Sequence, residues 1–440
     1  MQQTKITFLG GLDTIGGNII CIQHGKFRIL TDFGAQVGTS MEEQLDARHT
    51  GYLVEAGKLP KVQGIYPAEN LYDCEFVESF EESDMETLIC LSHLHIDHIG
   101  SLKHVSQEIP VFCLADAKPL YDLLTQTNLL PDYDINLQGM EPDEALEFGP
   151  FTIHFHESDH DALGSAAIFI ECPDLKIVYS GDLRLTGFHP NRVLSWAQKA
   201  RNWQADLLLI EGTSFSFGLV EPTPEQAAID ALTSPWNLTT EAQAIQAFHD
   251  LFKQETETCV AFNGYPQNVE RTVKYIEAAH LAGRIIALRL DLQELVQPFL
   301  TSDIETIILT EETLTDIKQS PHHYALMVSP EDVSWLNVAS EGIYLHSNGH
   351  PLGHYMPDYA EYVQTIVKAG WTFVQAGVSG HAYKEDLLTL AYLVDAQVTV
   401  PWHTFNRQGY LQALQERGIR TWEPVLHETY DAQTIQNLGR

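Results

Sequence analysis

The chain has 440 residues, of which 44% are hydrophobic and 19% are charged, a composition typical of a globular protein with a large core. Its 60 acidic and 25 basic residues give a formal charge of −35, which argues against the broad basic surface of a protein that coats nucleic acid. A narrow phosphate-binding cleft is still compatible with this charge, because bound divalent cations supply local positive charge. The length predicts two domains.

The six cysteines include no Cys-x-x-Cys pair, and several lie in apolar runs, which predicts buried free thiols in a reducing compartment. The N-terminal residues lack the basic flank and long apolar run of a signal peptide. No apolar run approaches the roughly 18 residues of a membrane span. We therefore expect a cytoplasmic protein that does not cross a membrane.

The N-terminal part predicts strands over residues 5–9, 19–22 and 27–30, with Asp32 two residues after the third. Residues 36–75 show no clean period, and the sequence assigns them no role. The apolar run 87–91 predicts a buried strand, and a helix is expected to start at Gly100. The segment between them therefore lies at the C-terminal end of a strand, where an α/β sheet places its chemistry.

This segment holds four ligand-type side chains within six residues: His93, His95, Asp97 and His98. His93 and His95 alternate, so in extended backbone their rings point the same way, and Asp97 and His98 follow where the chain turns. Imidazole nitrogen and carboxylate oxygen bind zinc, and two such ions roughly 3.5–4 Å apart can clamp a phosphoryl or acyl group. The pattern predicts a site for two divalent cations, Zn²⁺ first and Mn²⁺ as the alternative.

Further strands are expected at 111–114, 151–155, 166–171, 176–180 and 207–210, with a helix over 117–129. Three histidines, His154, His156 and His160, lie close before the 166–171 strand, and their types alone leave open which one binds a metal. Asp182 follows the 176–180 strand, and Glu211 follows the all-apolar 207–210 strand. Both carboxylates are therefore expected at strand ends.

From about residue 216 to 365 the sequence pattern changes to alternating predicted helices and strands. A helix over 240–253 has Thr240 and Gln243 spaced for a capping box, and strand 258–262, helix 269–281 and strand 284–288 follow. Strand–helix–strand spacing of this kind predicts a parallel, Rossmann-like sheet. Lys318 is the only lysine or arginine between 290 and 365, so a basic lid that grasps RNA is not supported.

The C-terminal part predicts a strand over 373–378, which runs into Ser379, Gly380 and His381, and a helix over 384–394. A strand over 397–400 ends at His403, and Arg407 lies close enough in sequence to face a phosphate.

The His-x-His-x-Asp-His pattern at 93–98 resembles the signature of the metallo-β-lactamase superfamily. Glu211, the Ser-Gly-His-Ala run at 379–382 and His403 resemble motifs A, B and C of its nucleic-acid-processing β-CASP branch, in the order found in the ribonuclease J family. The resemblance implies an αββα sandwich, residues 1–215 and 366–440, with an inserted Rossmann-like β-CASP domain, residues 216–365. The chain ends about where the catalytic core of that family ends, so we expect no C-terminal assembly domain.

The resemblance also implies roles for individual residues. One metal is expected on His93, His95 and His160, with His156 as the fallback for His160, and the other on Asp97, His98 and His403, with Asp182 bridging both. Asp97, Glu211 and His381 form the predicted catalytic set, in which His381 assists the leaving oxygen. Ser379, Gly380 and His381 are expected to contact the substrate phosphate, and Asp32 to orient the metal loop.

The implied function is a dinuclear metal-dependent hydrolase that cleaves phosphodiester bonds, most simply an RNA-processing nuclease with RNA or another single-stranded nucleic acid in the cleft between the domains. Three alternatives stay open: a hydrolase of a small ester, thioester or lactone, a non-catalytic member that binds RNA or a partner, and a DNA-directed nuclease. The sequence also leaves open the native metal, internal against end-directed cleavage, and the oligomeric state, including a homodimer.

Overall fold

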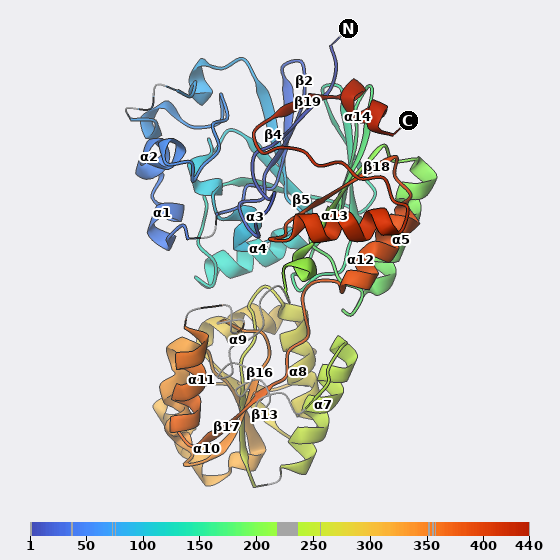
Figure 1. Ribbon diagram of the computed structural model, residues 1–440. Coiled ribbons are helices and arrows are strands. Elements are labelled where there is room, and N and C mark those ends of the chain that lie inside the picture. The colour runs from blue at the N-terminus through green and yellow to red at the C-terminus, as the bar shows by residue number, and fades with distance from the viewer. Residues whose placement is uncertain are drawn as a thin grey trace.

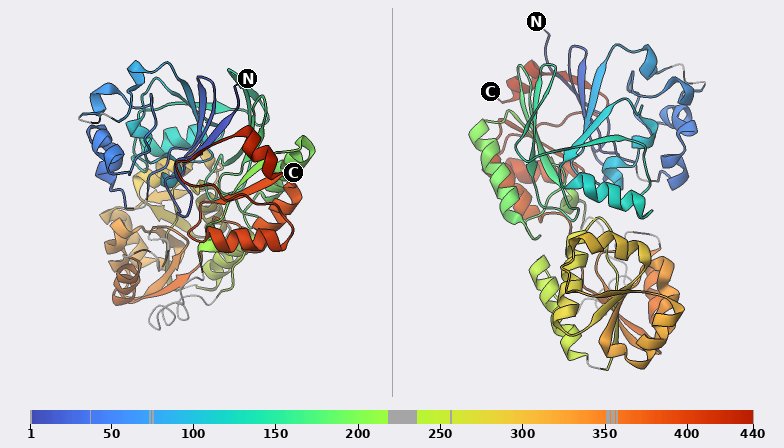
Figure 2. Two further views of the ribbon diagram at one scale, coloured as in Figure 1. Left: turned by 45° about the horizontal axis from the view of Figure 1, so that its top comes forward. Right: turned by 180° about the vertical axis from the view of Figure 1, so that it is seen from behind.

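A computed structural model describes residues 2–36, 38–72, 74, 76–217, 236–255, 257–350, 353, 356 and 358–439. The chain forms two bodies, a large one built on two sheets and a smaller one built on a third sheet (Figure 1). Both termini lie on the side of the large body that faces away from the small one, as two further views also show (Figure 2). Within the described residues, every helix is too short or too polar to cross a bilayer.

The large body contains a seven-stranded and a six-stranded sheet. The first has the order β19 (Thr429–Asp431), β1 (Lys5–Phe8), β2 (Ile20–His24), β3 (Phe27–Thr31), β4 (Glu86–Cys90), β5 (Pro110–Leu114) and β6 (Asn136–Met140). The second has the order β18 (Val398–Trp402), β11 (Leu207–Glu211), β10 (Lys176–Tyr179), β9 (Ala166–Glu171), β8 (Phe151–Glu157) and β7 (Ala145–Phe148). The pairs β3–β4, β10–β11 and β11–β18 are parallel, which brings the ends of these strands to common edges.

The two sheets pack face to face because alternate residues of each strand are apolar on both sides. In β11, Leu207 and Leu209 join the core between the sheets, and Leu208 and Ile210 join the core under the outer helices. Helices α5 (Pro190–Trp203), α12 (Lys384–Val394) and α13 (Arg407–Glu416) cover the six-stranded sheet, and α4 (Ala117–Gln126) covers the other. The predicted αββα sandwich is therefore confirmed.

The remaining helices of the large body are short. The segment 36–75 contains α1 (Met41–Leu45) and α2 (Thr50–Glu55), and the chain closes with α14 (Ala432–Leu438). The helix expected to start at Gly100 is instead α3 (Ile96–Ile99), with Gly100 ending it. The prediction placed this helix too late, because the turn that follows His95 is itself helical and carries Asp97 and His98.

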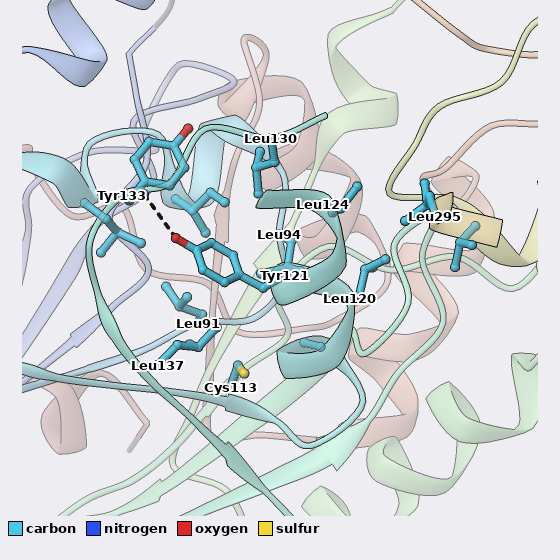
Figure 3. Close-up of a cluster of buried hydrophobic side chains, with 14 of the residues drawn as sticks. Leu91, Leu94, Cys113, Leu120, Tyr121, Leu124, Leu130, Tyr133, Leu137 and Leu295 are labelled. Atoms are coloured by element: carbon cyan, nitrogen blue, oxygen red, sulfur yellow. Dashed lines mark hydrogen bonds between the residues drawn. The ribbon is translucent and has the colours of Figure 1, made fainter. Parts of the chain in front are cut away.

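An apolar layer supports the segment that carries the metal-binding pattern (Figure 3). Leu91 and Leu94 on either side of His93 are fully buried, and so are Leu120 and Leu124 of α4. The Tyr121 hydroxyl accepts a hydrogen bond from the backbone N–H of Tyr133 at 3.1 Å, which ties α4 to the following loop. Each fully buried leucine contributes roughly 1.5–3 kcal/mol, so the loop above rests on a rigid base.

The small body is an all-parallel sheet in the order β14 (Thr306–Ile308), β13 (Ile285–Leu288), β15 (Tyr324–Met327), β12 (Cys259–Phe262), β16 (Gly342–His346) and β17 (Trp371–Gln375). Helices α7 (Glu241–Gln254), α8 (Val269–Leu281) and α9 (Leu290–Val296) cover one face, and α10 (Glu311–Gln319) and α11 (Tyr359–Lys368) cover the other. This is the Rossmann-like arrangement that the strand–helix spacing predicts.

The sheet of the small body extends past residue 365, the predicted end of the inserted domain. The strand β17 pairs in parallel with β16. It enters the sheet there because α11 packs on this same sheet and the chain turns back at Gly370, whose φ of 91° suits glycine. The chain therefore returns to the large body after β17, on the segment that carries Ser379, Gly380 and His381.

Candidate metal centre and active site

The candidate site lies where several strands of the large body end. The loops after β4, β8, β10 and β18 carry the predicted ligands, and the loop between β17 and α12 carries His381. The backbone turns sharply at two of these places, since φ is positive at Gly181 (55°) after β10 and at His403 (53°) after β18, and it does so again at Asp32 (59°) after β3. A Cβ at Gly181 would come within 2.7 Å of the Ser92 Cβ, so glycine is needed beside the metal loop.

The first group of side chains consists of His93, His95 and His160, each offering one atom within 4.8 Å of the others. The His160 Nδ1 donates to the carbonyl of Gly380 at 2.5 Å, which leaves Nε2 without a proton, 3.1 Å from the Nδ1 of His95. The Ser92 hydroxyl donates to Asp32 and accepts from the His93 Nδ1 at 3.0 Å. The Nε2 of His93 and the Nε2 of His95 have no hydrogen-bond partner, and the unprotonated Nε2 of His160 faces the same space.

The second group consists of Asp97, His98, Asp182 and His403. The Nε2 of His403 lies 3.2 Å from the Asp97 carboxylate, and the Nε2 of His98 lies 3.2 Å from Asp182. Asp182 also lies 3.8 Å from the Nε2 of His93 in the first group. Asp182 is thus the carboxylate that faces both groups.

Several buried polar atoms of these two groups have no hydrogen-bond partner: His93 Nε2, His95 Nε2, Asp182 Oδ1 and His403 Nε2. Asp182 Oδ1 lies 2.8 Å from the His403 Nδ1 but is not aligned for a hydrogen bond. Buried polar atoms are rarely left unpaired in proteins, and a cluster of them indicates a binding site for an ion. Nitrogen and carboxylate donors in this number fit two divalent cations such as Zn²⁺ or Mn²⁺.

The three histidines near β9 separate clearly in space. His160 joins the first group, whereas His154 and His156 lie on β8 with their rings stacked 6.2 Å apart. His156 pairs with Asp143 and packs against Phe169. It lies on the helix-covered side of the sheet, because Phe169 belongs to the core beneath α5.

Replacing His160 by alanine should therefore remove one of two equivalents of bound Zn²⁺, since the first group would keep two imidazoles. Replacing His156 by alanine is the matched control and should leave both equivalents in place. Metal analysis after dialysis, together with calorimetric titration, measures the stoichiometry. Loss of an equivalent in the His156 variant would contradict this assignment.

Asp32 is the buried support of the metal loop. It accepts hydrogen bonds from the Ser92 N–H (2.7 Å), the His98 Nδ1 (2.8 Å) and the Tyr179 hydroxyl (2.5 Å). Carboxylates that hold the second ring nitrogen of a ligating histidine fix its orientation. Asp32 thus has the position expected for a group that orients His98.

Two further residues, which the sequence did not predict, support the site. The Asn18 amide donates to the carbonyl of Asp97 at 3.1 Å and lies 3.0 Å from the Nε2 of His98. Tyr179, the last residue of β10, reaches Asp32 from the opposite sheet. The only available signals were a glycine-rich turn before Asn18 and a strand end at Tyr179, and neither points to a site by itself.

The ionisable groups divide the centre into two halves. Burial lowers the pKa of His93 and His95, and it lowers that of His160 to about 3, so this half is neutral and ready to bind a cation. In the other half, burial opposes protonation, but Asp182 and Asp97 outweigh it and raise the pKa of His403 to about 9. Cation binding to that half would release protons.

His381 and Glu211 lie at the edge of the second group. The Nδ1 of His381 donates to Glu211 at 3.2 Å and lies 3.9 Å from Asp182. Glu211 is fully buried, and the side chain of His381 is 24% exposed, so the imidazole faces the open side of the site. The Glu211 carboxylate thus pairs with His381, outside the seven predicted ligands, and also accepts from the Thr213 N–H at 2.7 Å.

The other predicted phosphate contacts have local partners. The Ser379 hydroxyl accepts from the His381 N–H at 3.0 Å, and the Gly380 carbonyl accepts from His160. Helix α12 begins only at Lys384, so its first turn lies beyond these residues. Arg407, which the sequence allowed to face a phosphate, instead pairs with Asp13 at 2.9 Å.

Comparison with known proteins agrees with this fold. The family model described as "Beta-lactamase superfamily domain" matches residues 81–256. The chain carries a metallo-β-lactamase superfamily domain, as the pattern at 93–98 predicts.

Among curated proteins, the homology to β-CASP members is weak. Ribonuclease J of Helicobacter pylori (strain ATCC 700392 / 26695) is 22% identical over 298 residues, which cover 66% of this chain and 37% of that protein. Integrator complex subunit 11 of Danio rerio is 24% identical over 242 residues, 48% of this chain and 34% of that protein. The chain thus matches little more than a third of the length of these relatives.

Among solved structures, a protein of unknown function from Enterococcus faecalis V583 is similar over nearly the whole chain. It is 26% identical, with a TM-score of 0.81, and the match covers 98% of this chain and all of that one. Both bodies of the fold are therefore shared with a known structure.

Proposed function

We propose that the protein is a dinuclear metal-dependent phosphodiesterase that cleaves RNA. The observation that carries the proposal is the convergence of seven ligand-type side chains, from His93 to His403, on two adjoining groups. The weak homology to ribonuclease J supports nucleic acid as the substrate. Six buried free cysteines agree with a cytoplasmic location.

His93, His95 and His160 would hold one cation, and Asp97, His98 and His403 the other, with Asp182 shared between them. Bound cations would supply Lewis acidity toward the phosphoryl oxygens and lower the pKa of water at the site. The chain itself holds the ligands in place. Asp32 fixes the ring of His98, and Asn18 fixes the backbone at Asp97.

His381 is the proposed group for proton transfer to the leaving oxygen. Its Nδ1–H is held by Glu211, so the Nε2 is directed away from that carboxylate and is available to the substrate. Positioned imidazoles of this kind contribute roughly 10²- to 10⁴-fold to such steps. Ser379 and Gly380 complete the proposed phosphate contact on the same loop.

A second candidate function is hydrolysis of a small ester, thioester or lactone. The formal charge of −35 favours it, because an acidic surface repels long polyanions. For the RNA function, this charge implies few lysine or arginine contacts to phosphate and hence a small dependence of affinity on salt.

The test is a substrate panel with protein reloaded with Zn²⁺ or Mn²⁺ after chelation. We expect cleavage of 5′-phosphorylated RNA and of bis(p-nitrophenyl) phosphate, and no activity in the chelated protein. Cleavage of single-stranded DNA alone would indicate a DNA-directed nuclease. Turnover of a thioester or lactone without phosphodiester cleavage would instead support the second candidate, and binding of RNA without any turnover would indicate a non-catalytic protein.

A further inference from the structure

Four charged side chains form a buried chain of ion pairs between the two bodies. Asp159 and Arg184 come from the large body, and Glu241 and Arg271 come from α7 and α8 of the small body. Their exposed fractions are at most 3%. Arg184 contacts Asp159 at 3.1 Å and Glu241 at 2.6 Å, and Arg271 contacts Glu241 at 2.7 Å. The charges alternate and cancel.

Glu241 is the link on which this chain of ion pairs depends. It accepts from Arg184 through Nη1 and from Arg271 through both Nε and Nη2. Among the described residues, no other carboxylate lies within 4.0 Å of Arg271. Without the Glu241 charge, two guanidinium groups would face each other in a buried space, which is unfavourable.

Arg271 connects this chain of ion pairs to the loop that carries His381. Its Nη2 donates to the carbonyl of Val378 at 2.8 Å, and its Nη1 donates to the carbonyl of Ser347 at 3.2 Å. Two residues after Val378, the carbonyl of Gly380 holds the His160 ring. A Cβ at Gly380 would come within 2.4 Å of the Asp161 carboxylate, so this loop is closely packed against the His160 loop.

Arg184 connects the same chain of ion pairs to the segments that carry Asp182 and His160. Its backbone N–H donates to the carbonyl of Asp159 at 2.7 Å, which joins the two loops. The carbonyl of Leu183 accepts from the Ala382 N–H at 2.7 Å. At least one sequence neighbour of His160, of Asp182 and of His381 is therefore connected to the same buried charges.

We infer that Glu241 is a positioning residue through which the small body fixes the His160 and His381 loops at the metal centre. The inference rests on the proposed metal-binding role of His160. The strands β4 and β18 carry His93, His95, Asp97, His98 and His403 without help from Glu241. Asp182, which faces both groups, is connected to Glu241 indirectly, through its neighbours Leu183 and Arg184, so loss of the Glu241 charge should disturb the metal position that contains His160 more than the other.

The test compares Glu241→Gln with the wild-type chain by calorimetric Zn²⁺ titration and hydrogen exchange. Glutamine keeps the shape of glutamate and removes its charge. We expect the binding step that is absent in His160→Ala to weaken roughly 10- to 100-fold, as for other supporting groups of metal ligands, and the other step to weaken much less. Backbone exchange of the 376–382 segment should become faster. Arg271→Lys, which keeps the charge but cannot reach both carbonyls, should give the same pattern.

Glu270→Gln is the matched control. Glu270 lies next to Arg271 on α8 and pairs with the ring of His189 of the large body at 2.7 Å, so it also joins the two bodies. His189 donates to Asp159 through its backbone N–H, a bond that does not depend on the Glu270 carboxylate. Its removal should change neither binding step. The inference is overturned if Glu241→Gln binds metal and exchanges as the wild type does, or if both binding steps weaken equally together with global unfolding. None of these measurements uses a substrate, so they test the role of Glu241 even if the protein does not cleave RNA.

Discussion

Replacing Asp182 by asparagine should lower kcat/KM for a phosphodiester by roughly 10³- to 10⁴-fold, the equivalent of several kcal/mol of transition-state stabilisation. Asp182 is 1% exposed and lies within 3.9 Å of His93, His98, His160 and His403. Asparagine keeps the volume but offers one neutral oxygen in place of two charged ones, so it cannot serve both cations. Steady-state kinetics with bis(p-nitrophenyl) phosphate, together with metal analysis, measures the effect.

Asp143→Asn is the control for this prediction. Asp143 also pairs with a histidine, His156, and with Lys199, but on the helix-covered side of the sheet. Its replacement should leave the activity within a factor of about two, because Asp143 lies away from the metal centre. The fold should also be kept, since such surface substitutions change the free energy of unfolding by only about 0.5 kcal/mol. Full metal-dependent activity in Asp182→Asn would mean that the chemistry takes place elsewhere in the molecule.

The sequence predicted the parts of this protein whose signals are local. Helices 269–281 and 384–394 agree with α8 and α12 in their bounds, and Thr240 caps α7 through Gln243 as expected. The pattern at 93–98 also indicated its chemistry directly, because four ligand-type side chains within six residues after a buried strand are typical of a metal site. Local spacing was sufficient in each case.

Properties that depend on which distant segments meet were not accessible from the sequence. His154, His156 and His160 have the same side chain, and only the direction of β8 shows that the first two point away from His93. The pair Glu241–Arg271 lies buried between α7 and α8, and nothing in its spacing distinguishes it from an ordinary exposed charge pair. Likewise, the predicted domain boundary at 365 falls inside α11, and β17 follows this helix. The boundary was placed too early because a short apolar pattern does not show that the helix packs on the sheet.

Replacing His381 by alanine should lower kcat roughly 10²- to 10⁴-fold for RNA, whose leaving group is a ribose hydroxyl that must gain a proton. For bis(p-nitrophenyl) phosphate the decrease should be much smaller, because p-nitrophenolate leaves without one. The imidazole is suited to this role since Glu211 holds its Nδ1–H at 3.2 Å and the ring is partly exposed to the open side of the site. Measuring both substrates with the same preparation gives the ratio directly.

Glu211→Gln provides the graded comparison for this last prediction. Glutamine can still accept a hydrogen bond from the His381 Nδ1, so the imidazole ring should stay oriented. The protonated imidazole, however, loses the negative charge of its partner. We expect a decrease for RNA that is smaller than that of His381→Ala, again with little change for bis(p-nitrophenyl) phosphate. Equal decreases for the two substrates in His381→Ala would mean that His381 serves to bind phosphate and does not transfer the proton.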